Sequence, residues 1–401
     1  MGRPLLILHV IDSLANSGGS ERQLVRNLRL FSDQRLSHEV VCLYPRPGND
    51  RIAEIPDSVP VSTLAGPGEN PGRAQVIHRL SAHVARRHPD LMHCSLANAS
   101  LAARVVGILR RIPVVESLVN LSYEPIRRAD NPAIKRWNFE AYRWMDKLTM
   151  VKVTRFHAVS EAVAASWIRH VGLPPDKMRV VPRGLELTTL DAEFERAPSR
   201  QELLKSLGLS PDTFLIANSG RQDAQKGQVY ALEAMPHILE DVPTAVLAIA
   251  GAQGNMTTRL ARSVEDLGLQ GRVLLLGHRP DAAQLLTAAD AFIFPSLFEG
   301  MPGALLEAMA CRLPCIAFSL PPMDEILSHE LTGLLTTPRS PSGLADAVIR
   351  LATDSQLRHR LGDAARASVE TKYRAENAAA ALEQIYLEVL EGMWSSPAPS
   401  D

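Results

Sequence analysis

Two glutamates flank a segment of the chain that bends and then begins a helix. The stretch FEGMPGALLE spans residues 298–307, with Glu299 ahead of the glycines and Glu307 eight positions later. The apolar run AFIFPS just before it predicts a buried strand. Glu299 therefore falls in a strand-to-helix loop, and Glu307 about five residues inside the helix, roughly 8 Å further along its axis. One extended ligand can contact both carboxylates.

The backbone between these glutamates suits an anionic group. Pro302 fits the first helical position, where its missing N–H would have had no partner. The free N–H groups of a first helical turn carry partial positive charge, and glycines let the backbone approach a ligand closely. The corner consists of Gly300, Met301, Pro302 and Gly303. The structural alternative is that Glu299 only favours the helix N-terminus and that Glu307 is a solvated residue.

A second loop supplies cations. NSGRQDAQKGQ (218–228) follows the apolar run TFLIA and places Arg221 and Lys226 five residues apart. An arginine fork and a lysine point charge at the carboxyl edge of a sheet suit a diphosphate. Ordinary surface solvation is the alternative for any such pair. The carboxylate loop in the same half of the chain favours a common site.

Near the start of the chain, NSGGSER (16–22) places Gly18 and Gly19 just before a helical pattern. The spacing is not that of the dinucleotide fingerprint G-x-G-x-x-G, so a nicotinamide-dependent oxidoreductase is disfavoured. A glycine pair alone is a weak signal, and a tight turn is the structural alternative.

Strand and helix patterns alternate along most of the chain. In the first half, PLLILHVI, HEVVCLY, DLMHCS and PVVESL predict strands that alternate with helices. In the second half, TFLIANSG, AVLAIAGA, RVLLLG, AFIFPS and PCIAFS do the same. This alternation predicts an α/β protein with two doubly wound parallel sheets. Residues 180–199 lose the periodicity and gain proline and charge, which predicts a hinge there.

Composition excludes several classes of protein. A chain of 401 residues exceeds the usual size of a single core, and its formal net charge of −1 gives no overall field that would recruit nucleic acid. The four cysteines lack the histidine spacing of a zinc site, which fits a reducing cytoplasm. The N-terminal apolar run is too short for a signal peptide, and the longest apolar run, near 245–252, falls well short of a membrane span.

Five stretches together resemble a known family, the retaining glycosyltransferases of family four (glycosyl transferases group one). They are SGGSERQL, HAVSEAV, VVPRG, SGRQDAQKG and ADAFIFPSLFEGMPGALLEAMACRLPCIAF, and the last carries the Glu-x7-Glu pattern typical of that family. The resemblance implies the GT-B fold, in which two Rossmann-like domains face a central cleft. It implies an acceptor domain at 1–182, a nucleotide-sugar donor domain at 183–372, and at 373–401 a helix packing back toward the N-terminal domain, followed by a frayed tail.

The resemblance also implies roles for single residues. Arg221, Lys226 and Glu299 would be catalytic, with the two cations stabilising the departing phosphate. Glu307 would accept hydrogen bonds from the ribose. The full set implied for the donor is Gly18, Gly19, Arg221, Lys226, His278, Arg279, Glu299, Gly300, Met301, Pro302, Gly303 and Glu307. His278 and Arg279 would meet the nucleobase through their backbone.

The family mechanism implies a front-face substitution without a dedicated nucleophile. No D-x-D stretch occurs in the sequence, so we expect no catalytic metal and no cofactor beyond the nucleotide-diphosphate sugar itself. A two-carboxylate glycosidase is the competing use of Glu299 and Glu307, and it is disfavoured by the cations and the helix N-terminus nearby. A nucleotide-sugar epimerase of the same fold and a non-catalytic nucleotide-sugar-binding protein remain as alternatives.

The chain departs from the family after the strand PVV. Many members have a histidine there that faces the transferred sugar, but this chain reads ESLVNLS at 116–122. Ser117 or Asn120 could orient the sugar or the acceptor instead, and His93 at the end of the preceding strand is another candidate. A histidine satisfied by backbone at a strand end is the alternative for His93.

One stretch is both basic and aromatic. Residues 124–156 hold eight Arg or Lys against four acidic residues, with tryptophan, tyrosine and phenylalanine interleaved. Such a helix can bind an anionic membrane surface, and a packed helix with a solvated rim is the commoner outcome. The sequence thus predicts a cytoplasmic enzyme, with peripheral contact to the inner face of a membrane as one option. Its expected partners are a nucleotide-sugar donor and a glycan, lipid-linked or small-molecule acceptor.

Overall fold

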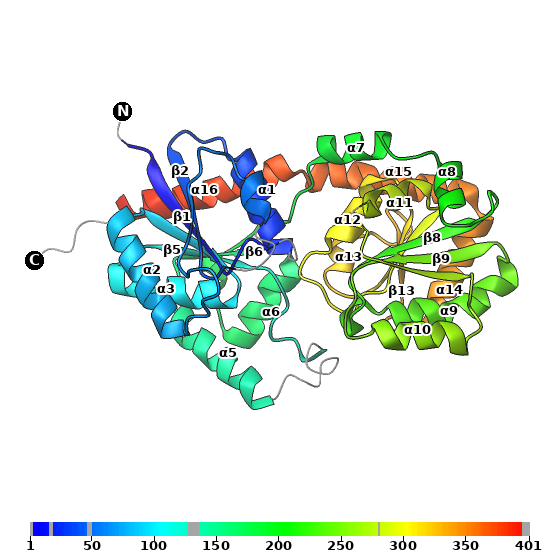
Figure 1. Ribbon diagram of the computed structural model, residues 1–401, viewed down its shortest axis with the longest axis horizontal. Helices are drawn as coiled ribbons and strands as arrows, with labels where there is room; N and C mark the ends of the chain where they lie inside the picture. Colours follow the sequence, from blue (N-terminus) through cyan, green and yellow to red (C-terminus); the bar gives the residue numbers. More distant parts are fainter. Residues whose placement is uncertain (1–2, 16–18, 46–49, 127–135, 280, 395–401) are drawn as a thin grey trace, which may run out of the picture. The chain divides into compact units, whose positions relative to one another are not determined.

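The computed structural model describes residues 3–15, 19–45, 50–126, 136–279 and 281–394. They fall into two compact units (Figure 1). Unit 1 comprises Met1–Glu124, Ile134–Gly184 and Ala375–Asp401, and unit 2 comprises Pro125–Ala133 and Leu185–Arg374. The chain therefore leaves unit 1 after Gly184 and re-enters it at Ala375 for its last helix.

Unit 1 is built on a parallel sheet that has seven strands within the described residues, in the order β3-β2-β1-β4-β5-β6-β7. The strands are β1 (Leu5–Ile11), β2 (Leu36–Cys42), β3 (Val61–Thr63), β4 (Leu91–Ser95), β5 (Val114–Leu118), β6 (Arg155–Ala158) and β7 (Met178–Val180). The strand order reverses between β1 and β4. In open α/β sheets, ligands bind at the carboxyl ends of the strands beside such a reversal.

Helices cover both faces of this sheet (Figure 1). They are α1 (Gly19–Leu30), α2 (Arg73–Arg87), α3 (Ala97–Arg110), α5 (Arg136–Met150), α6 (Glu161–Val171) and α16 (Ala375–Trp394), with short 3₁₀ helices at Asp50–Glu54 and Pro175–Lys177. Successive side chains of β1 point to opposite faces of the sheet. Leu8 and Val10 pack against α2 and α3 on one face. On the other face, Ile7 packs against α16 and Ile11 against α1. His9 lies on the second face, between Ile7 and Ile11.

Unit 2 repeats the design with a parallel sheet of six strands in its described part, ordered β10-β9-β8-β11-β12-β13. These are β8 (Phe214–Ser219), β9 (Ala245–Ala250), β10 (Val273–Gly277), β11 (Ala291–Phe294), β12 (Cys315–Phe318) and β13 (Leu334–Thr336). β9 is buried along its whole length, as expected for a parallel strand covered on both faces. Here the order reverses between β8 and β11.

Helices cover both faces of the second sheet as well (Figure 1). They are α7 (Leu187–Glu195), α8 (Arg200–Ser206), α9 (Gln228–Asp241), α10 (Thr257–Asp266), α11 (Ala282–Ala288), α12 (Gly303–Ala310), α13 (Met323–Ile326), α14 (Pro341–Thr353) and α15 (Ser355–Lys372), with a 3₁₀ turn at Ala224–Lys226. The core of this unit gathers apolar residues of α9, α14, β8 and β9. The predicted α/β class with two doubly wound parallel sheets is thereby confirmed.

The segment 180–199, where a hinge was predicted, contains the helix α7. One local prediction differs from the structure. Pro302 was expected at the first helical position, whereas α12 begins at Gly303 and Pro302 lies just outside it with extended backbone angles. Across the described ranges, no helix combines the length and the apolar character that crossing a membrane requires.

Candidate functional site

The reversal point of unit 2 gathers two of the residues singled out from the sequence. Lys226 lies in the loop after β8 and Glu299 in the loop after β11, and these are the two strands between which the order reverses. Lys226 Nζ lies 2.6 Å from Glu299 Oε1. Residues 73 positions apart thus form one ion pair at the carboxyl edge of the sheet.

The Lys226–Glu299 pair is partly shielded from water and held by neighbours. The side chain of Lys226 is 22% exposed and that of Glu299 is 9% exposed. The Ser296 hydroxyl donates to the same Glu299 Oε1 at 2.6 Å, and the ammonium lies 5.9 Å from the centre of the Phe294 ring. Among the residues that the structure describes, both partners of Glu299 use Oε1, which leaves Oε2 for a ligand hydroxyl. The lysine remains a fixed positive charge beside it.

Close backbone packing brings these loops together. Gly227 has a φ of +60°, and a Cβ there would lie 2.0 Å from the carbonyl oxygen of Pro295. A Cβ on Gly251, after β9, would lie 1.9 Å from the carbonyl oxygen of Gly220. No side chain fits at either glycine, so the loops after β8, β9 and β11 pack backbone against backbone. Sequence reasoning had not singled out these two glycines.

Arg221 does not join the lysine in this structure. Its side chain is 64% exposed and its Nε lies 2.9 Å from Asp223 Oδ2. An exposed pair of this kind contributes little to stability and can open to take a ligand. Glu307 lies half-buried in the second turn of α12, eight residues beyond Glu299, and both Gly300 and Met301 are buried in the preceding loop.

The loop after β10 was expected to meet a nucleobase. His278 is exposed, and Arg279 forms a two-point pair with Asp281, with Nη2 2.6 Å from Oδ2 and Nε 2.9 Å from Oδ1. This hydrogen bonding lowers the pKa of Asp281 and raises the pKa of Arg279. Residue 280 of this loop, and Gly18 in the other half of the chain, lie outside the described residues.

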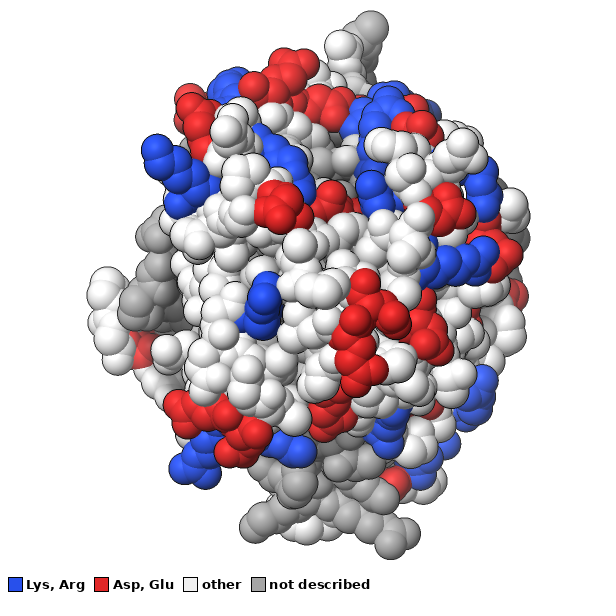
Figure 2. Space-filling model, turned by 90° about the vertical axis from the view of Figure 1, so that its right-hand side faces the viewer, with Lys and Arg blue, Asp and Glu red and all other residues white. Residues whose placement is uncertain are grey.

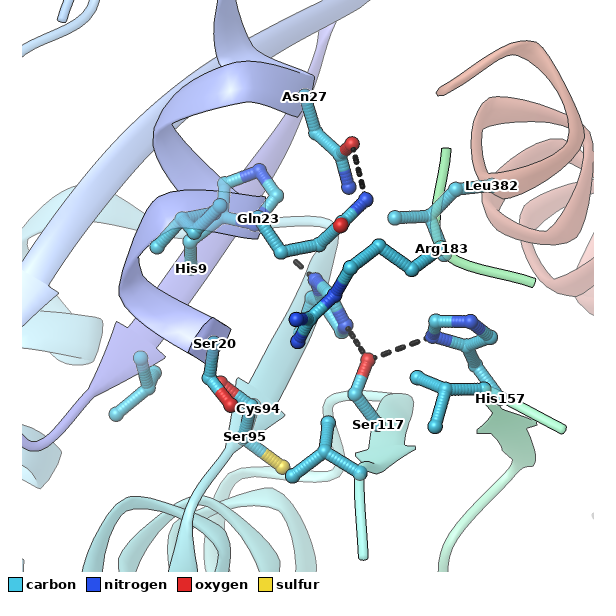
Figure 3. Close-up of a pocket in the computed structure, with 15 residues that line it drawn as sticks. His9, Ser20, Gln23, Asn27, Cys94, Ser95, Ser117, His157, Arg183 and Leu382 are labelled. Atoms are coloured by element: carbon cyan, nitrogen blue, oxygen red, sulfur yellow. Dashed lines mark hydrogen bonds between the residues drawn. The ribbon is translucent and has the colours of Figure 1, made fainter. Parts of the chain in front are cut away.

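Unit 1 has a small pocket at its own reversal point (Figure 3). The cavity measures about 30 Å³, enough for ordered water or a small group of a larger ligand. It is lined by His9, Val10, Ser20, Gln23, Leu24, Asn27, His93, Cys94, Ser95, Ser117, Val119, His157, Val159, Arg183 and Leu382. Two of the three candidates for orienting a sugar or acceptor, His93 and Ser117, meet here.

Ser117 lies between two buried imidazoles (Figure 3). Its Oγ is 2.7 Å from His93 Nε2 and 2.8 Å from His157 Nδ1, and His157 Nε2 lies 3.0 Å from the carbonyl oxygen of Val181. That carbonyl can only accept, so Nε2 of neutral His157 carries the hydrogen and Nδ1 accepts from the serine. Ser117 in turn accepts from His93 Nε2–H.

The hydrogen-bond chain continues across two more strands. His93 Nδ1 lies 2.8 Å from the Tyr386 hydroxyl of α16 and 3.2 Å from His9 Nδ1. The other ring nitrogen of His9, Nε2, lies 3.0 Å from His38 Nδ1. Because His93 Nε2 already donates, its Nδ1 is an acceptor, so His9 donates to it and accepts from His38. All the hydrogen bonds of this network, which crosses the sheet from β2 to β6, therefore have the same direction. Each donor lies on the side nearer to His38, and each acceptor on the side farther from it.

Burial keeps these imidazoles neutral. It lowers the pKa of His38 to about 4 and that of His93 to about 3. Burial also lowers the pKa of His9 and of His157. The cause in each case is the loss of water around a charged ring, to which neighbouring histidines add for His9 and His93. At neutral pH each ring therefore has one N–H and one acceptor nitrogen, which is what this hydrogen-bond network requires.

A cation crosses the mouth of this pocket. The guanidinium of Arg183 extends over Ser117 toward the first turn of α1 (Figure 3). A Cβ on Gly19 would lie 2.8 Å from its Nη1, so the glycine leaves the space that the arginine fills. Asn120 stands apart: it is exposed, its Oδ1 accepts from the Ser122 hydroxyl, and its carbonyl oxygen accepts from Trp167 Nε1 at 3.0 Å.

Sequence reasoning had missed His9, His157, Tyr386 and Arg183. A signal existed for two of them, because HAVSEAV and VVPRG had been singled out as motifs and contain His157 and Arg183. Across the described parts of the chain, no group of three or more His, Cys, Asp or Glu side chains is arranged to hold a metal ion.

Comparison with known proteins matches both halves of the chain to families. Residues 199–368 match the glycosyl transferases group 1, and residues 17–189 match glycosyltransferase family 4. A UDP-Gal:alpha-D-GlcNAc-diphosphoundecaprenol alpha-1,3-galactosyltransferase of Escherichia coli is 24% identical over 84% of this chain and 86% of its own length. An uncharacterized glycosyltransferase of Methanocaldococcus jannaschii is 30% identical over 76% of each chain.

The fold has solved counterparts. The structure of Anabaena HepE in complex with UDP-glucose superposes with a TM-score of 0.77, covering 98% of this chain and 100% of that one at 21% identity. At this identity the likeness concerns the fold, a two-domain α/β architecture.

Proposed function

The chain belongs to the glycosyl transferases of group 1, with the GT-B fold, and from that premise we propose that it is a retaining enzyme whose donor is held by Lys226 and Glu299. The family and its relatives make it a nucleotide-sugar glycosyltransferase, and they do not favour the epimerase alternative. The observation that supports the proposed site is the shielded Lys226–Glu299–Ser296 group at the β8/β11 reversal point.

The residues that we assign to the donor have distinct tasks in the proposed reaction. The ammonium of Lys226 binds the diphosphate and stabilises the negative charge that grows on it as the bond to the sugar breaks. Glu299 positions that ammonium through Oε1 and binds sugar hydroxyls through Oε2. The exposed Arg221 exchanges its contact with Asp223 for a phosphate oxygen, and Glu307 accepts from the ribose.

We assign the acceptor to unit 1, with a small group of it entering the pocket around Ser117. The Ser117 hydroxyl is oriented by two imidazoles, and the guanidinium of Arg183 crosses the pocket above it. A hydroxyl beside a cation suits an acceptor that carries both a sugar hydroxyl and a negative charge. The relative from Escherichia coli is named for such an acceptor, a sugar linked to a lipid diphosphate.

The proposal is tested by incubating the protein with UDP-glucose and UDP-galactose. UDP should raise the melting temperature, by mass action on the folded state, and UDP should be released from one of the two sugars when a suitable glycolipid is supplied. An α-linked product from an α-linked donor establishes retention. Exchange of deuterium into C2 of the sugar would instead identify an epimerase, and binding without UDP release a non-catalytic protein.

Transfer should be independent of divalent metal. Lys226 and the N-terminal turn of α12 provide the positive charge that a metal supplies in other transferases. We therefore expect the same rate of UDP release in excess EDTA as in buffer containing Mg²⁺. A rate that falls in EDTA and returns on addition of Mg²⁺ or Mn²⁺ would refute metal independence and leave the donor site itself standing.

A further inference from the structure

Helix α5 turns an apolar stripe toward solvent. Trp137, Ala141, Trp144, Leu148 and Val151, the last just beyond the helix end, follow one another at intervals of four and three residues. All five are exposed, and the four large ones are 68%, 57%, 76% and 65% exposed. A surface helix ordinarily directs such a stripe into the core. Here the orientation is reversed.

Polar contacts on the opposite side fix this orientation. Asp146 accepts from Arg104 Nη1 at 2.6 Å and from the Tyr123 hydroxyl, and Arg104 also donates through Nε to Glu116 Oε2 at 2.7 Å. Arg104 and Glu116 are almost fully buried. Rotating α5 to hide its apolar stripe would separate Asp146 from the buried Arg104 and from the Tyr123 hydroxyl, and it would leave Arg104 with Glu116 alone. The stripe is therefore a stable feature of the surface.

Two more exposed apolar residues lie near the end of α3. Ile108 is 47% exposed and Leu109 is 65% exposed, and α3 packs beside α5. We call these two residues, together with the five of the α5 stripe, the α3–α5 face. Isolated exposed apolar residues are ordinary, but seven of them on and just beyond two neighbouring helices mark a binding surface.

Cations border the α3–α5 face. They are Arg110, Arg111, Lys147 and Lys152. Lys147 Nζ lies 5.2 Å from the centre of the Trp144 ring, and Arg110 Nε donates to the Ser81 hydroxyl at 3.1 Å. Within the described part of the chain, none of these four has a carboxylate partner. One face of unit 2, by contrast, intersperses acidic and basic side chains (Figure 2).

A cavity of about 250 Å³ lies beside the face, between the end of α3 and the residues that follow α5. Its lining includes Arg111 and Lys152, both exposed, and Ile108 of the face itself. Two exposed cations that line a cavity next to apolar side chains fit a lipid phosphate headgroup whose acyl chains continue over the apolar residues.

We propose that the α3–α5 face docks unit 1 on an anionic lipid bilayer, with Trp137 and Trp144 at the headgroup level and Arg111 and Lys152 binding lipid phosphate. Tryptophan at the interface and basic residues beside it are the chemistry that membrane surfaces select. A second copy of the chain fits less well, because pairing two such faces would bring like charges together. The proposal goes beyond the transfer reaction and does not depend on which donor or acceptor is used.

Vesicle binding by the full-length protein tests this. We expect sedimentation with phosphatidylglycerol-containing vesicles, weaker binding at high salt, none to pure phosphatidylcholine, and a blue shift of tryptophan fluorescence on binding. The double variant Trp144→Glu/Leu148→Glu should lose binding. Arg111→Gln/Lys152→Gln should bind about 30-fold more weakly, from the loss of two basic residues. Leu331→Glu, at an exposed leucine of unit 2, is the matched control and should bind like the parent.

The increase in melting temperature caused by UDP should be measured on each variant. It should be the same as for the parent, which shows that the donor site is intact when membrane binding is lost. Equal binding of the parent and Trp144→Glu/Leu148→Glu to anionic vesicles would overturn the proposal, and so would equal binding to both vesicle types. The α3–α5 face would instead bind a second copy of the chain if two results were obtained together. The parent would be a dimer in light scattering that does not bind vesicles, and the variant Trp144→Glu/Leu148→Glu would be a monomer.

Discussion

Replacing Lys226 by alanine should lower kcat for sugar transfer by about 10²–10³-fold, the usual cost of removing one preorganised group that stabilises charge in the transition state. The ammonium lies in a partly shielded site, 2.6 Å from Glu299, so no other cation of the described residues replaces it there. Arg221→Ala, which removes an exposed side chain paired with Asp223, should cost less. Steady-state UDP release measures both.

A loss of activity could also come from misfolding, because Lys226→Ala strands the buried Glu299 carboxylate. The double variant Lys226→Met/Glu299→Gln removes both charges and keeps the side-chain volumes, so it should restore stability without restoring transfer. If its activity returned together with its stability, the ammonium would be structural only. A Lys226→Ala enzyme with kcat near that of the parent would refute the assignment directly.

Unit 1 should lose stability as the pH falls below about 6.5. His38 and His93 have pKa values of about 4 and 3 in the folded state and about 6.5 in the unfolded chain. Between pH 6.5 and those folded values, only the unfolded state binds the protons, so acid favours unfolding. Each of the two histidines then removes about 1.4 kcal/mol per pH unit, or about 2 kcal/mol by pH 5.

Native-state hydrogen exchange can localise this loss. Protection of β1 and β4 should fall from pH 7 to pH 5, whereas protection of β8 and β11 should change little, since the described histidines of unit 2 are exposed. The variant His38→Gln keeps an amide N–H that can donate to His9, but its side chain does not titrate. The free energy of unfolding should therefore depend less steeply on pH, by the contribution of one proton. If the hydrogen-exchange protection of β1 were the same at pH 5 as at pH 7, the buried histidines could not be neutral in the folded state.

The sequence predicted those elements whose residues carry their own signal. Long runs such as β1 and β9 are recognisable because a parallel strand covered on both faces is mostly apolar. Strands of three residues, such as β3, β7 and β13, are too short to show any period and depend on the neighbour with which they pair. The two glutamates could be singled out because both carboxylates lie in one segment.

Contacts that depend on strand order could not be predicted. His9 and His93 are register partners only because β1 pairs with β4, which the linear sequence does not state. The side of α5 that faces inward follows from Asp146 meeting Arg104, a contact between helices 42 residues apart in the chain. Periodicity gives the stripe on α5, and only the buried ion pairs decide that it faces outward.

The membership of α16 in unit 1 has a consequence for biosynthesis. Leu382, Ile385 and Tyr386 of this last helix pack against the first strand of the chain, and the Tyr386 hydroxyl completes the contacts of His93. A ribosome makes these residues after the whole of unit 2. Unit 2 can therefore fold during translation, while the amino-terminal half waits with one face of its sheet uncovered until α16 has been made, and it is the part most in need of a chaperone.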